Sequence, residues 1–285
     1  MQKPILLVIM AHPDDESFAL GGTLALYARR GVEVHDLCAT RGEAGSVDPK
    51  FLEGYDSIAA LREAELSCAA QKLGLAEVHF LGFRDSGMAG SPDNNHPDAL
   101  SAQPVEAVAA RMVCHIRRIR PQVVVTHDPI GGYLHPDHIA THRAAARAFY
   151  LAGDAGYVSQ EAPYQPQKLY FHVNPKKYFR LAFRIMKLLG KDFSHFGRNG
   201  DIDISSIIEQ GDFPTQAHID YKSVIASAEA ASACHASQMG GGPRQRGLLS
   251  FLFRLGGPYD QFMKAYPYPT VGLRETDLFE GVTLD

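Results

Sequence analysis

The stretch Ile5-Leu6-Leu7-Val8-Ile9-Met10-Ala11-His12-Pro13-Asp14-Asp15-Glu16 decides how the rest of the chain is arranged. Its first six residues are apolar and mostly branched, which is typical of a strand buried on both faces of a parallel sheet. One imidazole and three carboxyl groups follow within the next six residues. So many ionisable groups at the end of a buried strand are costly to desolvate unless an opposite charge compensates them. We therefore expect a divalent cation beside this stretch.

A second group of ionisable residues follows another apolar run, Val123-Val124-Val125. It begins with His127 and Asp128 and continues as Tyr133-Leu134-His135-Pro136-Asp137-His138. Our central hypothesis is that the two groups meet in space and hold one metal ion.

Composition and charge limit the classes of protein to consider. At 285 residues, the chain is long enough for one large α/β domain. A net charge of −4 gives no electrostatic support for binding nucleic acid. We expect no membrane span and no signal sequence, because every apolar run is too short. The four cysteines, Cys38, Cys68, Cys114 and Cys234, are far apart, so we expect reduced core thiols in a cytoplasmic protein.

Apolar runs alternate with helical patterns along the first 150 residues. We expect strands at residues 5–10, 32–38, 78–81 and 122–126, and helices at residues 17–30, 57–73, 105–119 and 137–150. This order predicts an α/β fold with a Rossmann-like, doubly wound, mostly parallel sheet and helices on both faces. In the strand order 3-2-1-4-5, the first and fourth strands are neighbours at the topological switch point, where ligands bind. No G-x-G-x-x-G follows the first strand, so a dinucleotide site is not expected.

The pattern is weaker beyond residue 150. We expect a strand at 168–173, a helix at 219–234, and a C-terminal extension, residues 151–285, that completes the fold and covers the site. Residues 1–150 would be the core of a single domain spanning 1–285. The basic, apolar segment Lys176 to Lys191 suits a surface helix, a lid or a subunit contact in a homo-oligomer. The Gly240 to Leu255 segment, a glycine hinge before apolar residues, suits a loop that folds over a substrate.

The two ionisable groups contain the parts of a hydrolytic metal site. A catalytic metal needs about three protein ligands, and His12, Asp15 and His138 supply two imidazoles and one carboxylate. This mixture suits Zn²⁺, with Fe²⁺ or another divalent ion as alternatives. A bound divalent ion lowers the pKa of water to about 7, and Asp14 is free to take a proton from that water.

Two further side chains complete this expectation. His135 could donate to a developing oxyanion or protonate a leaving amine, and Tyr133 could supply a second oxyanion donor. Together these parts describe metal-assisted hydrolysis of an amide. We expect Glu16 and Asp137 to orient ligand imidazoles from behind.

Each group alone also has an ordinary structural explanation. Asp14 or Asp15 could cap the helix that follows, and Asp137 could cap the helix after the second group. His127 and Asp128 are equally compatible with a turn before Pro129. It is the presence of both groups at neighbouring strand ends that favours a metal site.

Several motifs along the chain resemble the LmbE/PIG-L family of N-acetylglucosaminyl deacetylases, in particular its mycothiol-pathway deacetylase and S-conjugate amidase branches. They are AHPDDE at 11–16, TRGEAG at 40–45, RDSGM at 84–88, GGYLHPDH at 131–138, HASQ at 235–238 and ETDLF at 275–279. The resemblance implies a zinc-dependent de-N-acetylase on a Rossmann-like fold, with His12, Asp15 and His138 as ligands and Asp14 as general base. It also implies His135 and Tyr133 near the oxyanion, and Arg62, Asp85 and Met88 along the sugar pocket.

We therefore expect an enzyme that removes an acetyl or similar acyl group from an N-acetylglucosamine-type sugar or its glycoside, a small-molecule substrate. An amidase that cleaves a mycothiol-like S-conjugate is an alternative with the same site. A sugar- or metal-binding protein without catalysis is an alternative of another class.

Overall fold

The central sheet is built around β1, Ile5–Met10, the strand expected from the opening stretch. The computed structural model describes residues 3–174, 202–239 and 257–284, with a few single positions between 180 and 196. In this part of the chain, seven strands follow the order β3-β2-β1-β4-β5-β9-β8. The other bounds are β2 Glu33–Cys38, β3 Glu77–Phe80, β4 Val123–His127, β5 Lys168–His172, β8 Ala217–Asp220 and β9 Tyr259–Tyr266.

The order of the first five strands confirms the expected doubly wound arrangement. β1 pairs in parallel with both β2 and β4, so the topological switch point lies at the carboxyl ends of β1 and β4. β3 and β5 continue the parallel part outward. β9 runs antiparallel to its neighbours β5 and β8, which makes the sheet mixed but mostly parallel. A separate short pair joins β6, His195–Phe196, to β7, Ile202–Asp203.

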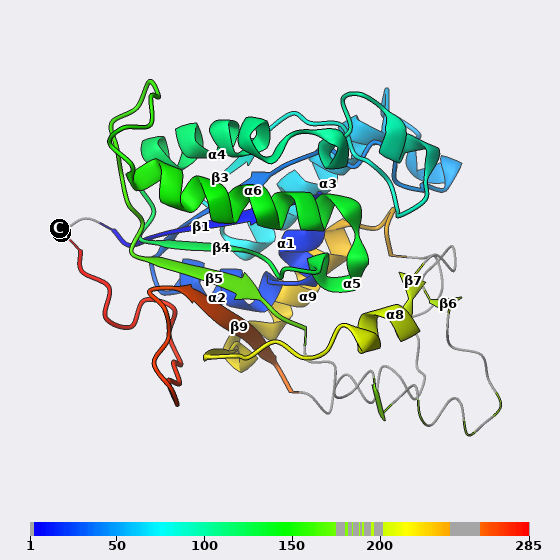
Figure 1. Cartoon of the computed structure of the whole chain (residues 1–285). Coiled ribbons are helices and arrows are strands. Elements are labelled where there is room, and N and C mark those ends of the chain that lie inside the picture. The colour runs from blue at the N-terminus through cyan, green and yellow to red at the C-terminus, as the bar shows by residue number, and fades with distance from the viewer. Residues whose placement is uncertain are drawn as a thin grey trace.

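Helices cover both faces of this sheet, as Figure 1 shows, with α4 and α6 on one face and α2 and α9 on the other. The bounds are α1 Asp15–Phe18, α2 Gly21–Arg29, α3 Ile58–Leu73, α4 Val105–Ile119, α5 Gly131–Leu134, α6 Pro136–Gly153, α8 Ile204–Glu209 and α9 Ile225–Cys234. Alternate residues of β1 enter two apolar cores: Leu7 and Ile9 lie in the core with α4 and α6, and Leu6 and Val8 in the core with α2. These cores fix the sheet, and hence the site at its carboxyl edge.

Two of the expected helices differ in the structure. The helix expected at 17–30 is broken between α1 and α2, at Ala19 and Leu20. In the first turn of α2, Gly22 approaches Tyr221 so closely that a Cβ would lie 2.1 Å from its ring. The helix expected at 219–234 starts only at Ile225. Ile219 instead pairs with Asp260 in the β8–β9 ladder, so tertiary pairing decides its conformation. The strand β9 was not expected from the sequence.

The expectation of reduced core thiols was wrong for three of the four cysteines. Cys68 and Cys234 form a disulfide between α3 and α9, with Cα atoms 5.8 Å apart and a separation of 166 positions in sequence. The reason is the side-by-side packing of α3 and α9, which sequence spacing does not reveal. Cys38 is a free, buried thiol as expected, whereas Cys114 is free but exposed.

Two segments to which the sequence analysis gave a role, and the expected absence of a membrane span, remain to be compared with the structure. Most of Lys176 to Lys191, and all of Gly240 to Leu255, lie outside the described residues, so the roles expected for them stay predictions. Among the described residues, no helix combines the length and the apolar character that crossing a bilayer requires.

Candidate active site

The carboxyl ends of β1 and β4 bring the two ionisable groups together. Ile9 of β1 lies beside Thr126 of β4, so the residues after each strand emerge next to one another. The backbone N–H of Ala11 donates to Nε2 of His127 at 3.1 Å, across 116 positions of sequence. α6 then begins at Pro136 and carries His138 in its first turn. The juxtaposition that we expected from strand order is therefore present.

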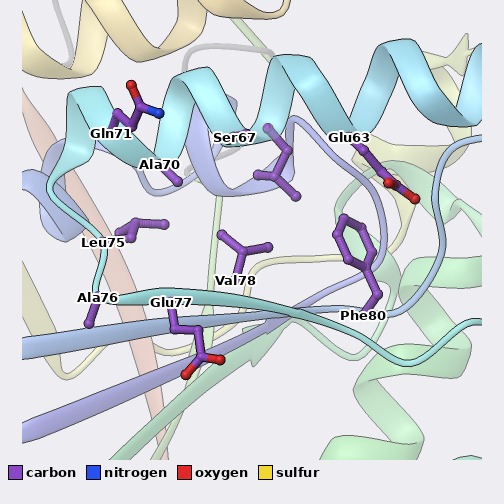
Figure 2. Close-up of a pocket in the computed structure, with 10 residues that line it drawn as sticks. Glu63, Ser67, Ala70, Gln71, Leu75, Ala76, Glu77, Val78 and Phe80 are labelled. Carbon is purple, nitrogen blue, oxygen red and sulfur yellow. The ribbon is translucent and has the colours of Figure 1, made fainter.

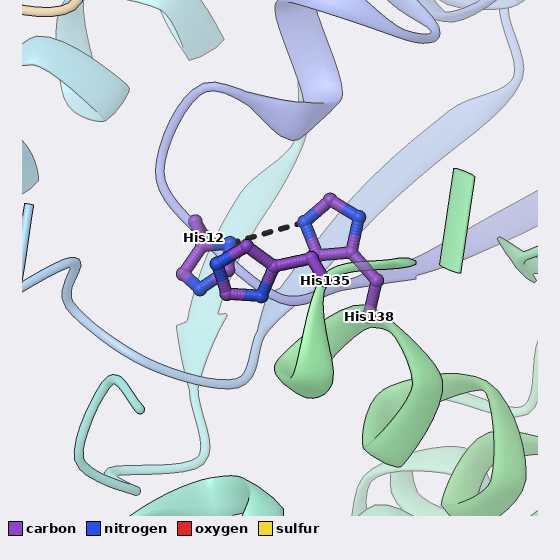
Figure 3. A group of neighbouring side chains, drawn as sticks. All are labelled: His12, His135 and His138. Atoms are coloured by element: carbon purple, nitrogen blue, oxygen red, sulfur yellow. Dashed lines mark hydrogen bonds between the residues drawn. The ribbon is translucent and has the colours of Figure 1, made fainter. Parts of the chain in front are cut away.

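Polar atoms of His12, Asp15 and His138 face one another in a small triangle, in which Asp15 turns a different carboxylate oxygen toward each imidazole. Nδ1 of His12 lies 3.2 Å from Nε2 of His138 and 3.5 Å from Oδ2 of Asp15. Nε2 of His138 lies 3.3 Å from Oδ1 of Asp15. Nitrogen ligands bound tetrahedrally to zinc at their usual bond lengths are about 3.3 Å apart, so the spacing suits one shared ion. Figure 3 shows the imidazoles of His12 and His138 facing each other, with the ring of His135 beside them.

The remaining polar atoms of these side chains already have partners. Nε2 of His12 lies 3.1 Å from Oδ2 of Asp137, so this nitrogen donates, and Nδ1 offers a lone pair to the site once the ring is neutral. His138 is hydrogen-bonded to the backbone of Gly131, which leaves its Nε2 directed at the triangle. The backbone N–H of His12 donates to Oδ2 of Asp15 at 2.9 Å. Such outer partners orient and tune metal ligands, and they confirm the expected position of Asp137 behind His12.

Gly131 is required by the same contacts. Its φ of +65° lies in the left-handed region, and a Cβ there would lie 2.8 Å from Cβ of His138 and 2.9 Å from the backbone nitrogen of Ile139. A side chain at this position would displace the first turn of α6.

The charge balance of the site favours a cation. Burial acts to lower the pKa of His12, but Asp85, Asp137 and Asp15 outweigh it and raise that pKa well above its usual value. Burial lowers the pKa of His138 to about 4, so its imidazole is neutral, the form that binds a metal. Burial opposes ionisation of Asp15, yet the neighbouring His138 and His12 hold its pKa well below the usual range. The site thus has an anionic carboxylate and one available imidazole lone pair in place.

Asp14 lies next to the triangle without joining it. Its backbone φ of 139° is rare for a residue other than glycine, and such strain is concentrated at functional sites. Burial raises the pKa of Asp14 to about 7, although the nearby positive charge of Arg62 acts in the opposite direction. Nη2 of Arg62 lies 3.0 Å from Oδ2 of Asp14 and also donates to the carbonyl oxygen of Pro13. Arg62 is itself buried, so this ion pair is shielded from water.

His135 and Tyr133 lie on the α6 side of the site. Nδ1 of His135 accepts a hydrogen bond from the backbone N–H of Asp137 at 3.2 Å, as the cap of α6. In the neutral ring, which burial favours by lowering the pKa of His135, the other nitrogen therefore carries the proton. The ring of Tyr133 lies 5.8 Å from that of His135 and 5.0 Å from that of His138, and burial raises the pKa of its hydroxyl.

The structure places Asp85 at the site and Met88 in the neighbouring loop. Oδ1 of Asp85 accepts from the backbone N–H of Gly87 at 2.8 Å and lies 3.5 Å from Nε2 of His12. The backbone carbonyl oxygen of Met88 accepts hydrogen bonds from Ser91 and Asn94 within the same loop.

The role expected for Glu16 was wrong. Its carboxylate does not orient a ligand imidazole but lies 2.7 Å from Nε2 of His235, and it accepts from Ser17 and from the backbone N–H of Asp14. The helix α1 turns Glu16 away from the triangle, toward the end of α9. His235 belongs to the HASQ motif, the only sequence signal that pointed to this contact.

Other residues at the site were missed or left open by sequence reasoning. The ring of His127 stacks on His138 with centroids 4.0 Å apart, and its Nε2 lies 3.6 Å from Oδ2 of Asp15. Ser86 donates to Asp137 through both its backbone N–H and its hydroxyl. A cavity of about 200 Å³ opens beside the triangle. It is lined by Asp14, Asp15, Phe18, Ala19, His127, Asp128, Gly132, Tyr133, His138, His172 and Asn174.

The fold agrees with the comparison to known proteins. Residues 7–149 match the PIG-L family model, described as GlcNAc-PI de-N-acetylase. The chain is 36% identical over 292 residues to the 1D-myo-inositol 2-acetamido-2-deoxy-alpha-D-glucopyranoside deacetylase of Acidothermus cellulolyticus, with 97% of this chain and 94% of that protein covered.

Two solved structures share the fold. One is the N,N'-diacetylchitobiose deacetylase of Pyrococcus horikoshii, with a TM-score of 0.62, 20% identity, and 94% of this chain and 87% of that chain covered. The other is GalB, the 4-carboxy-2-hydroxymuconate hydratase of Pseudomonas putida KT2440, with a TM-score of 0.61, 22% identity, and 95% and 99% covered. Since one is a deacetylase and the other a hydratase, the fold alone does not select the reaction. The family model and the near full-length relative do select the family: the chain belongs to the PIG-L family of de-N-acetylases.

Proposed function

We propose that this protein is a metal-dependent hydrolase that removes the N-acetyl group from an N-acetylglucosamine-type sugar carried as a glycoside. The observation that carries the proposal is the triangle of His12 Nδ1, Asp15 and His138 Nε2, with the raised-pKa carboxyl of Asp14 beside it. The relative from Acidothermus cellulolyticus is named as a deacetylase of acetamidoglucose that is linked to inositol. This name supports inositol as the aglycone of the substrate.

Within this proposal, His12, Asp15 and His138 hold the metal, and the donor set of two nitrogens and one oxygen favours Zn²⁺, with Fe²⁺ as the alternative. The fit rests on the spacing of the three atoms and on the outer partners that leave their lone pairs directed inward. When bound, a divalent ion lowers the pKa of water and polarises a carbonyl oxygen.

The proposed chemistry uses Asp14 as the general base. It takes a proton from water as the water oxygen bonds to the amide carbon, and the C–N bond then breaks to give acetate and an amine. A carboxyl with a pKa of about 7 suits this exchange, because it accepts and releases a proton near neutrality. Protonated Asp14 is one proton source for the leaving amine, and Nε2–H of His135 is the other.

We assign the oxyanion to His135 and Tyr133. The capping bond from Asp137 N–H occupies Nδ1 of His135, so Nε2–H is free to donate into the site. This arrangement favours an oxyanion donor over a metal ligand at His135. The hydroxyl of Tyr133 is kept protonated by burial and is the second donor.

We assign the sugar to the side of Arg62, Asp85 and Met88. Arg62 and Asp85 are buried next to Asp14 and His12, within reach of a group bound at the triangle. Met88 is assigned to this side from its place in the loop beside Asp85.

The direct test is acetate release. Purified protein loaded with one equivalent of zinc or Fe²⁺ should release acetate from N-acetylglucosaminyl inositol faster than from free N-acetylglucosamine. Release from a thiol S-conjugate amide in preference to either sugar would select the amidase alternative. Tight sugar binding with no turnover under any metal would establish a binding protein and refute the hydrolase.

We also propose that residues 1–285 form one catalytic domain, whereas the cytoplasmic location and the homo-oligomer expected from the sequence stay predictions. The joining of β5, β8 and β9 to the sheet begun by β1 supports the single domain. The Cys68–Cys234 disulfide argues against a reducing compartment, so subcellular fractionation is the test of location. Light scattering of the purified chain tests the oligomer.

A further inference from the structure

A further cluster of metal-ligating side chains lies on the two strands at one edge of the sheet, outside the candidate active site. His35 lies in β2, and Glu77 and His79 lie in the edge strand β3. The register places His35 beside Glu77. In Figure 2, Glu77 leaves β3 on the side opposite to Val78, which points toward α3. Since side chains alternate along a strand, Glu77 and His79 share the face away from α3.

The ligand atoms of this cluster are spaced for one ion. Nδ1 of His35 lies 3.2 Å from Nε2 of His79, and Nε2 of His79 lies 3.6 Å from Oε2 of Glu77. One atom from each of the three residues lies within 4.8 Å of both others. The two nitrogens thus have nearly the same separation as His12 and His138, and it matches the ~3.3 Å expected for two nitrogens on tetrahedral zinc.

An outer carboxylate prepares one of these imidazoles for binding. Nε2 of His35 lies 3.1 Å from Oε1 of Glu33, so this nitrogen carries the proton and donates it. Nδ1 of His35 then faces Nε2 of His79 and can offer its lone pair to an ion between them. A carboxylate that accepts from the far nitrogen of a ligand imidazole is the usual arrangement in zinc sites. Burial lowers the pKa of His79, which keeps its ring in the neutral, metal-binding form.

The surroundings allow an ion to enter and stay. The side chains of His35 and His79 are both 8% exposed, whereas that of Glu77 is 62% exposed, so the carboxylate forms the open side. The carboxylates of Glu33 and Glu77 oppose the positive charge of Arg118, which acts on His79 and is hydrogen-bonded to His115 at 2.9 Å. The ring of His115 closes the cluster from α4, 5.3 Å from that of His79.

We propose that His35, His79 and Glu77 form an additional site for zinc or a neighbouring first-row transition ion, which ties the edge strand β3 to β2. The alternative for the same geometry is a hydrogen bond between two neutral imidazoles with no ion. This site is independent of the proposed deacetylase reaction, because none of its residues belongs to the triangle of His12, Asp15 and His138.

The experiment counts zinc. Metal-free protein is dialysed against buffered micromolar Zn²⁺, and zinc per chain is measured by mass spectrometry. We expect two zinc ions per chain in the wild type and one in His79→Gln. His96→Gln, which removes an exposed histidine outside both clusters, should keep two. A wild type with the same zinc content as His79→Gln overturns the proposal.

Two further variants separate metal binding at this site from folding and from catalysis. Glu77→Gln changes an exposed side chain and should fold normally, yet weaken the second zinc by at least tenfold. His138→Ala should lose the zinc of the active site and keep the one on β2 and β3, so the two sites are counted independently. In crystals soaked with zinc, we expect an anomalous peak between His35 and His79. Imidazoles that stay in direct contact with no peak between them would refute the site.

Discussion

Nδ1 of His12 and Nε2 of His138 lie 3.2 Å apart although they are 126 positions apart in sequence. Each of these nitrogens faces the site because the other nitrogen of its ring is held by the protein, in one case by Asp137 and in the other by the backbone of Gly131. The residues behind the ligands therefore orient the ligand nitrogens. Substitutions at these residues and at the residues around the metal should have different effects.

Replacing the proposed base should remove turnover and leave the metal in place. Asp14→Asn keeps the size of the side chain and, like aspartate, asparagine tolerates a positive φ. We expect kcat to fall by about 10²–10⁴-fold, with the zinc content unchanged. Loss of zinc in this variant would instead make Asp14 a ligand.

The outer carboxylate behind His12 should control metal affinity. In Asp137→Ala, Nε2–H of His12 loses its acceptor, and we expect zinc affinity to fall by roughly 10–100-fold. Competition with a chelator of known affinity measures the change. Asp98→Ala, at an exposed loop position, is the matched control, and an equal loss there would show that the effect is not specific to the site.

His135 should act on the transition state and not on the metal. In His135→Ala, kcat should fall by about 10²–10³-fold because an oxyanion donor is lost, with little change in KM or zinc content. Steady-state kinetics and metal analysis test this. A proportionate loss of zinc would place His135 among the ligands, as its distance from His12 and His138 allows.

The charge of Arg62 should set the acid limb of the pH profile. The nearby guanidinium lowers the pKa of Asp14, so Arg62→Gln should raise that pKa, and the base is ionised only at higher pH. We expect the midpoint of the rise of kcat/KM with pH to move upward. Arg41→Gln, which breaks an exposed pair with Glu63, should leave the midpoint unchanged. An unshifted midpoint in Arg62→Gln would mean that another group governs the limb.

Stability should depend on pH through Asp260, far from the chemistry. Burial raises the pKa of Asp260 to about 7, although its carboxylate accepts hydrogen bonds from the hydroxyl and backbone of Thr23. An acid whose pKa is raised on folding binds more protons in the native state, so the free energy of unfolding falls as pH rises from about 4 to about 7. Asp260→Asn should therefore be more stable than the wild type at pH 8, by roughly 1–4 kcal/mol.

Urea unfolding at pH 8 and at pH 4 measures this difference. The two proteins should differ little at pH 4, where Asp260 is protonated in the native state and about half protonated in the unfolded state. An advantage of the variant that is the same at both pH values would point to packing and not to the charge.

The sequence by itself determined the local elements and the chemistry at their ends. The buried runs 5–10 and 123–125 are strands because their apolar side chains have no other place to be buried, and 105–119 is a helix with the bounds expected. The ionisable groups after the strands belong to the site because parallel strands of a doubly wound sheet deliver their carboxyl ends to one edge.

Only the tertiary structure decided which distant side chains meet. Glu16 faces His235 and not a ligand, Cys68 is bonded to Cys234, and Ile219 is in a strand because β9 lies beside it. The cluster of His35 with His79 likewise depends on the register of β2 and β3. Such contacts follow from how packed layers align in three dimensions, and no spacing along the chain encodes that alignment locally.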